Sequence, residues 1–278
     1  GETVRTLYFD CSMGAAGDML MGALYELLED QKFYLEIMNR LFPGVTVVAR
    51  PGDTFQVHGT YMDVWIDGEE EGEIEQSGSR QRFSAREKEA ASVKGIGDLL
   101  AHLPFPVSVI QNIREVYHKI LEAESRVHGI AVSQIHFSRL GDLDALVDIT
   151  GVCVALEMLK PDSICASPVC TGTGEIHCAR GVLPVPAPAT AMLLQRIPYY
   201  TGEIREELCT PTGAALLDHF VQKFGPPPDM ENTRNGYGLG KKKLPRASFV
   251  HAVWGEALDD AENGHDGDGH AKRQIHEH

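Results

Sequence analysis

The sequence predicts an α/β fold in which a mixed sheet is covered by helices, with an acidic disordered insert and a disordered C-terminal tail. A β-rich run, a small-residue loop and a helix-forming run open the chain, and strand-like and helix-like segments then alternate. The 278 residues are 43% hydrophobic and 23% charged, as in globular proteins. We therefore expect one α/β domain over residues 1–257 and a tail over 258–278.

The first predicted unit is a strand, a glycine loop and a helix. Residues 6–10 are apolar and β-rich, residues 11–18 have mostly small side chains, and residues 19–28 are good helix formers. Two β-branched runs, 45–50 and 60–66, then flank the turn-forming triplet Pro51-Gly52-Asp53. We expect these two runs to pair as a hairpin with its turn at that triplet.

The middle of the chain contains the insert and a long helix. Residues 67–79 carry six acids and no base, which is typical of a solvated flexible loop. Residues 97–103 predict a short helix, and residues 107–127 place apolar side chains at helical spacing. The second of these segments is expected to be a long amphipathic helix.

The second half alternates strands and helices up to the tail. Strands are predicted at 134–140, 163–169, 174–177, 199–200, 234–239 and 248–254, and helices at 143–159, 188–195 and 212–224. The tail is acidic and almost free of apolar residues, so we expect it to be disordered.

Composition narrows the class of partner. The net charge is −15 and no basic cluster interleaves with aromatic residues, which disfavours nucleic-acid binding. The six cysteines form no C-x-x-C pair and indicate reduced thiols. Neither a signal peptide nor an apolar run of about 18 residues is present, so we expect a cytoplasmic protein without membrane contact. Cations and small molecules are the expected partners.

Five short blocks of sequence, taken in their order along the chain, form a recognisable pattern. They are Leu7-Tyr8-Phe9-Asp10-Cys11 with Gly14, Gly17-Asp18-Met19 and Gly22-Ala23-Leu24; residues 127–130, 135–137 and 147–149; residues 181–190; residues 210–216; and residues 236–240. Together they resemble the LarC family of nickel-insertion proteins over residues 6–254. Two departures stand out: the 67–79 insert has no histidine, and His136-Phe137-Ser138-Arg139 replaces the family's His-Phe-His-Glu.

The resemblance implies a nickel chelatase, a lyase, that inserts Ni²⁺ into pyridinium-3,5-bisthiocarboxylic acid mononucleotide. The product is the nickel-pincer nucleotide of lactate racemase-type enzymes. Full-length members use CTP with Mn²⁺ or Mg²⁺ through a C-terminal domain, so CTP is expected here only if such a domain is supplied. That domain and an apo-racemase-type enzyme are the implied protein partners, and self-association is left open.

The glycine loop is the first candidate site. Asp10 and Cys11 would lie at the carboxyl end of the first strand, where a carboxylate and a thiolate suit a divalent metal. Asp18 would lie at the helix start, and Gly14 and Gly17 would let a phosphate approach the backbone. The alternative is that Cys11 packs as an apolar residue and Asp18 caps the helix. The resemblance favours the site.

Other candidates lie further along the chain. His136 is a metal ligand or a hydrogen-bonded structural residue. Asp148 shares a helix face with Asp144 and acts on a metal or on the pyridinium ring, or is an ordinary solvated acid. His177 and Cys178 suit nickel, although adjacent strand residues point to opposite faces.

The start of the 212–224 helix and the tail supply the last candidates. Thr210, Thr212 and Gly213 would bind a phosphate or simply cap the helix. The tail histidines would collect nickel loosely or belong to a solubilising tail; they are His265, His270, His276 and His278.

We therefore predict nickel insertion, with Asp10, Asp18 and Asp148 as catalytic residues and Cys11, His136, His177 and Cys178 as metal ligands. A base near the ring would remove the proton from the carbon that bonds the metal. A nickel-delivery module that needs a separate nucleotide-handling subunit is the first alternative. A metal-dependent nucleotide hydrolase built on Gly14-x-x-Gly17-Asp18 is the second.

Overall fold

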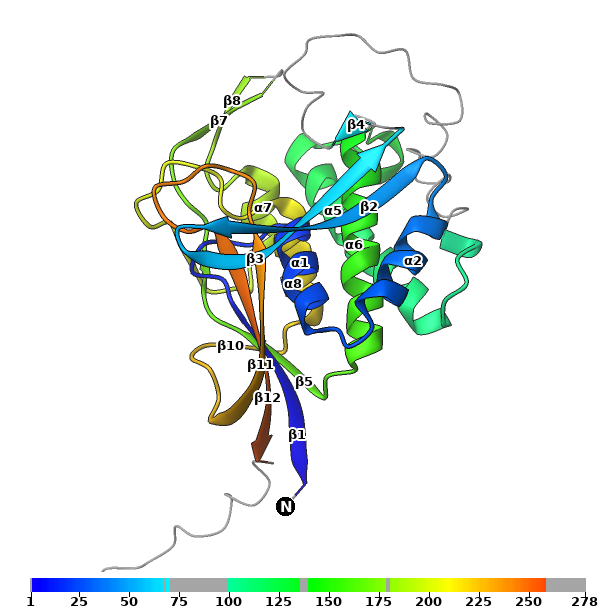
Figure 1. Cartoon of the computed structure of the whole chain (residues 1–278). Helices are drawn as coiled ribbons and strands as arrows, with labels where there is room; N and C mark the ends of the chain where they lie inside the picture. The colour runs from blue at the N-terminus through cyan, green and yellow to red at the C-terminus, as the bar shows by residue number, and fades with distance from the viewer. Residues whose placement is uncertain (1, 68, 71–99, 136–139, 179–180, 259–278) are drawn as a thin grey trace, which may run out of the picture.

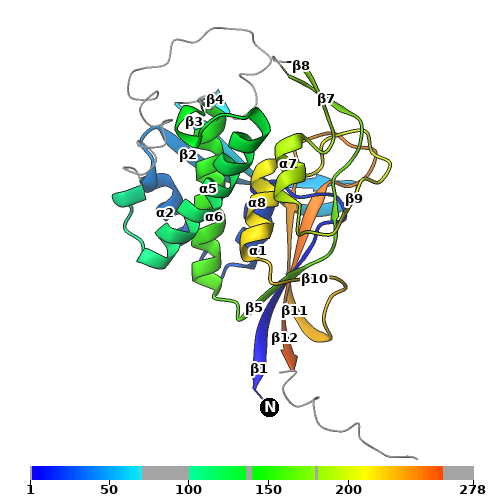
Figure 2. The same cartoon turned by 180° about the vertical axis from the view of Figure 1, so that it is seen from behind.

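The computed structural model describes residues 2–67, 69–70, 100–135, 140–178 and 181–258, and it places a mixed sheet beside a group of packed helices (Figure 1; Figure 2). The helices are α1 (Gly17–Leu27), α2 (Gln31–Leu41), α5 (Val107–His128), the 3-10 turn η1 (Val132–Gln134), α6 (Leu140–Leu159), α7 (Pro188–Leu193) and α8 (Pro211–Phe220). The strands are β1 (Thr3–Asp10), β2 (Val45–Thr54), β3 (Val57–Ile66), β4 (Glu69–Glu70), β5 (Ser163–Ala166), β6 (Val169–Cys170), β7 (Glu175–Cys178), β8 (Gly181–Pro184), β9 (Tyr199–Tyr200), β10 (Lys223–Phe224), β11 (Met230–Leu239) and β12 (Phe249–Leu258).

The main sheet has the order β10-β5-β1-β12-β11-β3-β2, with β4 added on β3. Strands β10, β5 and β1 run parallel, β12 is antiparallel to both β1 and β11, and β11 is parallel to β3. Strands β6 and β9 form a short parallel pair, and β7 and β8 form a separate hairpin. The predicted mixed α/β sheet is confirmed.

Helix α1 is the centre of the core. It packs on β3, β11 and β12 on one side and on α6 on the other, and α5 covers α6. Its apolar side chains are buried nearly all round, as expected for a helix enclosed by neighbours on every side. Gly238 of β11 faces this helix, and a Cβ there would overlap the carbonyl oxygen of Met19. Absence of a side chain at Gly238 therefore lets α1 lie directly on the sheet.

The N-terminal predictions hold except for the hairpin turn. Strand β1, helix α1 and the β2–β3 hairpin are found where expected. The turn is at Phe55 and Gln56, which both have positive φ, as in a two-residue hairpin turn. The prediction of a turn at Pro51-Gly52-Asp53 is wrong, because β2 is an edge strand and accepts a proline. Helix α2 was not predicted; Asp30 caps it by accepting a hydrogen bond from the Phe33 amide.

The C-terminal half needs three corrections. A strand over 134–140 is wrong, because Val132–Gln134 form η1 and α6 begins at Leu140; residues 136–139 lie outside the described residues. The run 163–169 is two strands separated at Ser167 and Pro168. The predicted 212–224 helix ends at Phe220, because Val221 is extended and β10 pairs with the edge of β5.

The remaining predictions fall partly outside the described residues. Within 67–79, Glu69–Glu70 form β4 on β3, so a loop prediction is wrong for that pair; residues 68 and 71–79 are not described. Leu100 and Ala101 are helical, and 97–99 are not described. Strand β12 continues to Leu258, one residue into the predicted tail, and 259–278 are not described. Among the described helices, none has the length and apolar character needed to cross a lipid bilayer.

Candidate functional site

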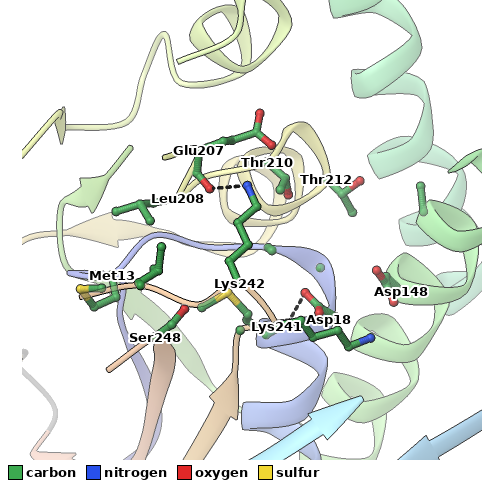
Figure 3. A pocket seen from close by; sticks show the side chains of 16 residues that line it. Met13, Asp18, Asp148, Glu207, Leu208, Thr210, Thr212, Lys241, Lys242 and Ser248 are labelled. Carbon is green, nitrogen blue, oxygen red and sulfur yellow. Dashed lines mark hydrogen bonds between the residues drawn. The ribbon is translucent and has the colours of Figure 1, made fainter. Parts of the chain in front are cut away.

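A cavity of about 380 Å³ lies where the first turn of α1, the first turn of α8 and the loop between β11 and β12 meet (Figure 3). It is lined by Met13, Ala16, Gly17, Asp18, Met19, Ala145, Asp148, Glu207, Leu208, Thr210, Thr212, Gly240, Lys241, Lys242, Leu244 and Ser248. Five of the predicted site residues are in this set: Gly17, Asp18, Asp148, Thr210 and Thr212. The cavity therefore joins candidates from three distant parts of the sequence.

Backbone pairing holds the two helix starts together. The Ala15 amide donates to the Leu208 carbonyl and the Thr210 amide donates to the Ala15 carbonyl, both at 3.0 Å. Gly14 precedes this contact with φ near +90°, a conformation that favours glycine. The N-termini of α1 and α8 consequently open on one cavity, and the positive ends of both helix dipoles favour an anion there.

Gly17 lets the carboxylate of Asp148 reach the first turn of α1. A Cβ added at Gly17 would lie 2.8 Å from the Asp148 Cβ and 3.0 Å from its Oδ2. Asp148, on α6, is only 5% exposed. The glycine of the motif is thus needed for space beside an acid that is distant in sequence.

Asp18 is the acid at the start of α1. Burial raises its pKa, and this effect outweighs the attraction of Lys241 and the hydrogen bond from the Met19 amide, 2.9 Å long, which lower it. A carboxyl group whose pKa is raised towards neutrality is suited to accept a proton from a bound molecule.

Two lysines of the β11–β12 loop complete the cavity, and the sequence predictions missed both. The Lys241 ammonium lies 3.3 Å from Oδ1 of Asp63, and the Arg50 Nε donates to Oδ2 of the same acid at 2.8 Å. Lys242 donates to the backbone carbonyl of Glu207 at 3.1 Å. The three consecutive lysines 241–243 in an otherwise acidic chain were the available signal.

The residues at the start of α8 act partly as a cap. The Thr210 hydroxyl accepts a hydrogen bond from the Gly213 amide at 3.2 Å. Helix capping, the alternative to a phosphate site, therefore accounts for the Thr210 hydroxyl and for the Gly213 amide. The Thr212 side chain lines the cavity beside Gly17.

Asp10 and Cys11 lie at the end of β1 but not in the cavity wall. Cys11 is 0% exposed, and burial raises the pKa of its thiol well above the usual value, with Cys209 and Asp10 adding to the effect. The thiol is held neutral within the hydrophobic core, which favours the packing alternative. Asp10 accepts a hydrogen bond from the Ser12 amide at 2.9 Å.

The predicted histidine and cysteine ligands are not brought to the cavity. His177 and Cys178 are exposed on the β7–β8 hairpin, which stands at the edge of the molecule, and His177 lies 4.0 Å from Glu175 (Figure 1). His136 and the tail histidines lie outside the described residues. Within the part of the chain that is described, no three histidine, cysteine or acidic side chains gather so that they could hold a metal ion.

Comparison with known proteins gives the family. The sequence profile described as nickel insertion protein matches residues 7–275. The chain belongs to the nickel insertion protein family. The predicted LarC resemblance is thereby confirmed, and no solved structure matches the chain.

Three relatives in this family illustrate the similarity. The chain is 34% identical to the putative nickel insertion protein of Syntrophobacter fumaroxidans, over 85% of this chain and 56% of the relative. It is 32% identical to the pyridinium-3,5-bisthiocarboxylic acid mononucleotide nickel insertion protein of Acetivibrio thermocellus, over 92% and 61%. It is 34% identical to the protein of the same name from Geobacillus kaustophilus, over 91% and 60%. The chain thus spans 56–61% of the length of these nickel insertion proteins.

Proposed function

We propose that this chain carries the substrate-binding and proton-accepting part of nickel insertion into pyridinium-3,5-bisthiocarboxylic acid mononucleotide. The observation that carries the proposal is that one cavity combines two helix N-termini and two lysines with the half-buried acid Asp18 and the buried acid Asp148. Membership of the nickel insertion family and the names of the relatives supply the reaction. Cationic groups suit the phosphate of the nucleotide, and carboxylates suit a divalent cation.

The proposed chemistry needs one proton acceptor. Ni²⁺ is a substrate, and the two thiocarboxylate sulfurs of the mononucleotide bind it in the product. The ring carbon between them exchanges its C–H bond for a C–Ni bond, and the proton leaves. Asp18 accepts that proton, because burial raises its pKa and places it closer to the working pH than an ordinary carboxylate. Asp148, beside the first turn of α1, stabilises the positive charge of nickel and ring.

The test is formation of the nickel-pincer product from Ni²⁺ and the thiolated mononucleotide, followed by its absorbance. We expect Asp18→Asn and Asp148→Asn to lower the rate by at least about 100-fold, whereas Asp229→Asn, an exposed acid outside the cavity wall, leaves it unchanged. Full activity of both cavity variants would refute the assignment of the cavity as the reaction site.

A second candidate function is nickel delivery to a separate nucleotide-handling subunit. It is favoured by the exposure of His177 and Cys178 on the β7–β8 hairpin, outside the cavity wall, since an imidazole and a thiol suit nickel. In this scheme a C-terminal domain uses CTP with Mn²⁺ or Mg²⁺, and an apo-racemase-type enzyme receives the product. The assay run with and without such a domain separates the two: delivery alone predicts nickel transfer but no product from the isolated chain.

A further inference from the structure

We propose that Lys242 binds the phosphate of the pyridinium mononucleotide, whereas Lys241 is a wall residue that does not. The inference rests on the proposed function and assigns an orientation to the substrate in the same cavity. It follows from the different acceptors that hold the ammonium groups of these two consecutive lysines. It also follows from the positions of Asp18 and Asp148 relative to those ammonium groups.

Lys241 is held by a buried acid. Its ammonium lies 3.3 Å from Asp63, whose side chain is 5% exposed, and the Lys241 side chain is 28% exposed. Arg50 holds the other carboxylate oxygen of Asp63 at 2.8 Å, which fixes the acid in place. Release of Lys241 towards a ligand would leave Asp63 buried with one of its ionic partners lost. The cost of that loss keeps Lys241 in the wall.

Lys242 is held by a neutral acceptor. Its ammonium donates to the Glu207 backbone carbonyl at 3.1 Å, so the side chain crosses the cavity towards the start of α8 (Figure 3). A phosphate accepts a charge-assisted hydrogen bond that is about twice as strong as one to a neutral carbonyl. Exchange of the carbonyl for a phosphate oxygen therefore favours binding, and the exposed side chain has room to make it.

The Lys242 ammonium and the carboxylates of Asp18 and Asp148 lie at different ends of the cavity, with the Glu207 side chain at the Lys242 end and Lys241 beside Asp18 (Figure 3). The Lys242 ammonium lies near Glu207 and Thr210, and the carboxylates of Asp18 and Asp148 lie away from it, on the side of α1 and α6 (Figure 3). The substrate has its phosphate at one end and, at the other, the pyridinium ring, whose two anionic thiocarboxylates bind Ni²⁺ and so bring positive charge to that end. The ligand consequently fits with the phosphate at the Lys242 end and the ring, with its nickel, at the acidic end.

The test measures how much the phosphate contributes to affinity in each variant. Titration calorimetry compares nicotinate mononucleotide with nicotinate riboside, which has the same ring and ribose but no phosphate. We expect the full chain to bind the nucleotide about tenfold or more tightly than the riboside. Lys242→Ala should abolish most of that ratio without changing riboside binding, and Lys242→Arg should restore part of it. Lys243→Ala, which alters the neighbouring lysine outside this cavity wall, is the matched control.

Each outcome decides between the two proposals. An unchanged ratio in Lys242→Ala, or an equal loss of affinity for both probes, overturns the role of Lys242 while nucleotide binding by the cavity stands. Loss of the ratio in Lys241→Ala but not in Lys242→Ala reverses the assignment. Failure of the wild-type chain to bind either probe refutes the proposed function together with the inference. Circular dichroism on every variant confirms that each one is folded.

Discussion

Asp18 and Asp63 are two acids beside Lys241 whose pKa values move in opposite directions. Burial raises the pKa of Asp18 because attraction to Lys241 is the weaker effect. Burial also acts on Asp63, but the hydrogen bond from Arg50 and the charge of Lys241 outweigh it and lower the pKa. Asp63, whose charge Arg50 and Lys241 stabilise, is a structural acid. Asp18, whose charged form is destabilised by burial, is the acid that lines the cavity.

The first prediction is that Asp18→Asn stabilises the protein at neutral pH. A raised pKa means that the folded state holds a proton that the unfolded state has released, so stability falls as pH rises from 3.8 through the raised value. Asparagine removes this effect and keeps the oxygen that accepts from the Met19 amide. Urea unfolding at pH 7 should show a gain of about 1 kcal/mol, absent below pH 3.8. A less stable variant at pH 7 would contradict the prediction.

The second prediction has the opposite sign, and it concerns Asp63→Asn. A lowered pKa contributes stability that is present above 3.8 and is lost as pH falls through the lowered value. The variant should therefore lose about 2 kcal/mol at pH 7, because the hydrogen bond to Arg50 no longer involves a charged acceptor. The loss should shrink at pH 3. Asp162→Asn, in the exposed ion pair with Arg5, should show a much smaller change.

Helix α1 packs directly against the backbone of strand β11. Two of the sequence blocks, residues 17–24 and residues 236–240, form this contact. The glycines of residues 236–240 face the helix that contains residues 17–24. The spacing within these blocks is therefore a packing requirement between helix and sheet, and the cavity lies at the end of the same contact. The third prediction tests this requirement.

Gly238→Ala should destabilise the fold by about 3 kcal/mol, because the new methyl group overlaps the Met19 carbonyl and α1 must move away from β11. Guanidinium unfolding measures the change. Gly129→Ala is the control: it has positive φ but no atom within 4 Å of the added Cβ, so it should cost only about 1 kcal/mol. Equal losses in the two variants would mean that close packing at Gly238 is not the cause.

Elements that depend on local signals were predictable, and those that depend on distant partners were not. The strand, glycine loop and helix at residues 3–27 follow from residue types along the chain. Strand β10 forms because it pairs with β5. The residue types of Lys223 and Phe224 do not by themselves predict a strand there. In the cavity, the positions of Asp18 and Thr212 were expected from the helix starts. The contact of Asp63 with Lys241 required the register of β3, β11 and β12, which no local pattern reveals.

At the scale of the whole molecule, the net charge of −15 opposes the binding of a nucleoside triphosphate. Within the cavity, Lys241 is held by Asp63, so Lys242 is the lysine that we assign to a phosphate. The fourth prediction is that the chain alone neither binds nor hydrolyses CTP at millimolar nucleotide with Mn²⁺. Calorimetry and phosphate release measure this. Rapid hydrolysis by the chain alone, lost in Asp18→Asn, would support the nucleotide hydrolase alternative instead.

Strand β1 is synthesised long before its two neighbours in the sheet, β5 and β12. Its eight residues from Thr3 to Asp10 pair with Leu258 back to His251, so the ladder at the middle of the sheet spans nearly the whole described chain. During translation β1 has no strand partner on its β12 side until residues 251–258 have left the ribosome. Closure of so long a loop makes folding slow. A nascent chain stalled before β12 should therefore depend on chaperones that shield exposed strands.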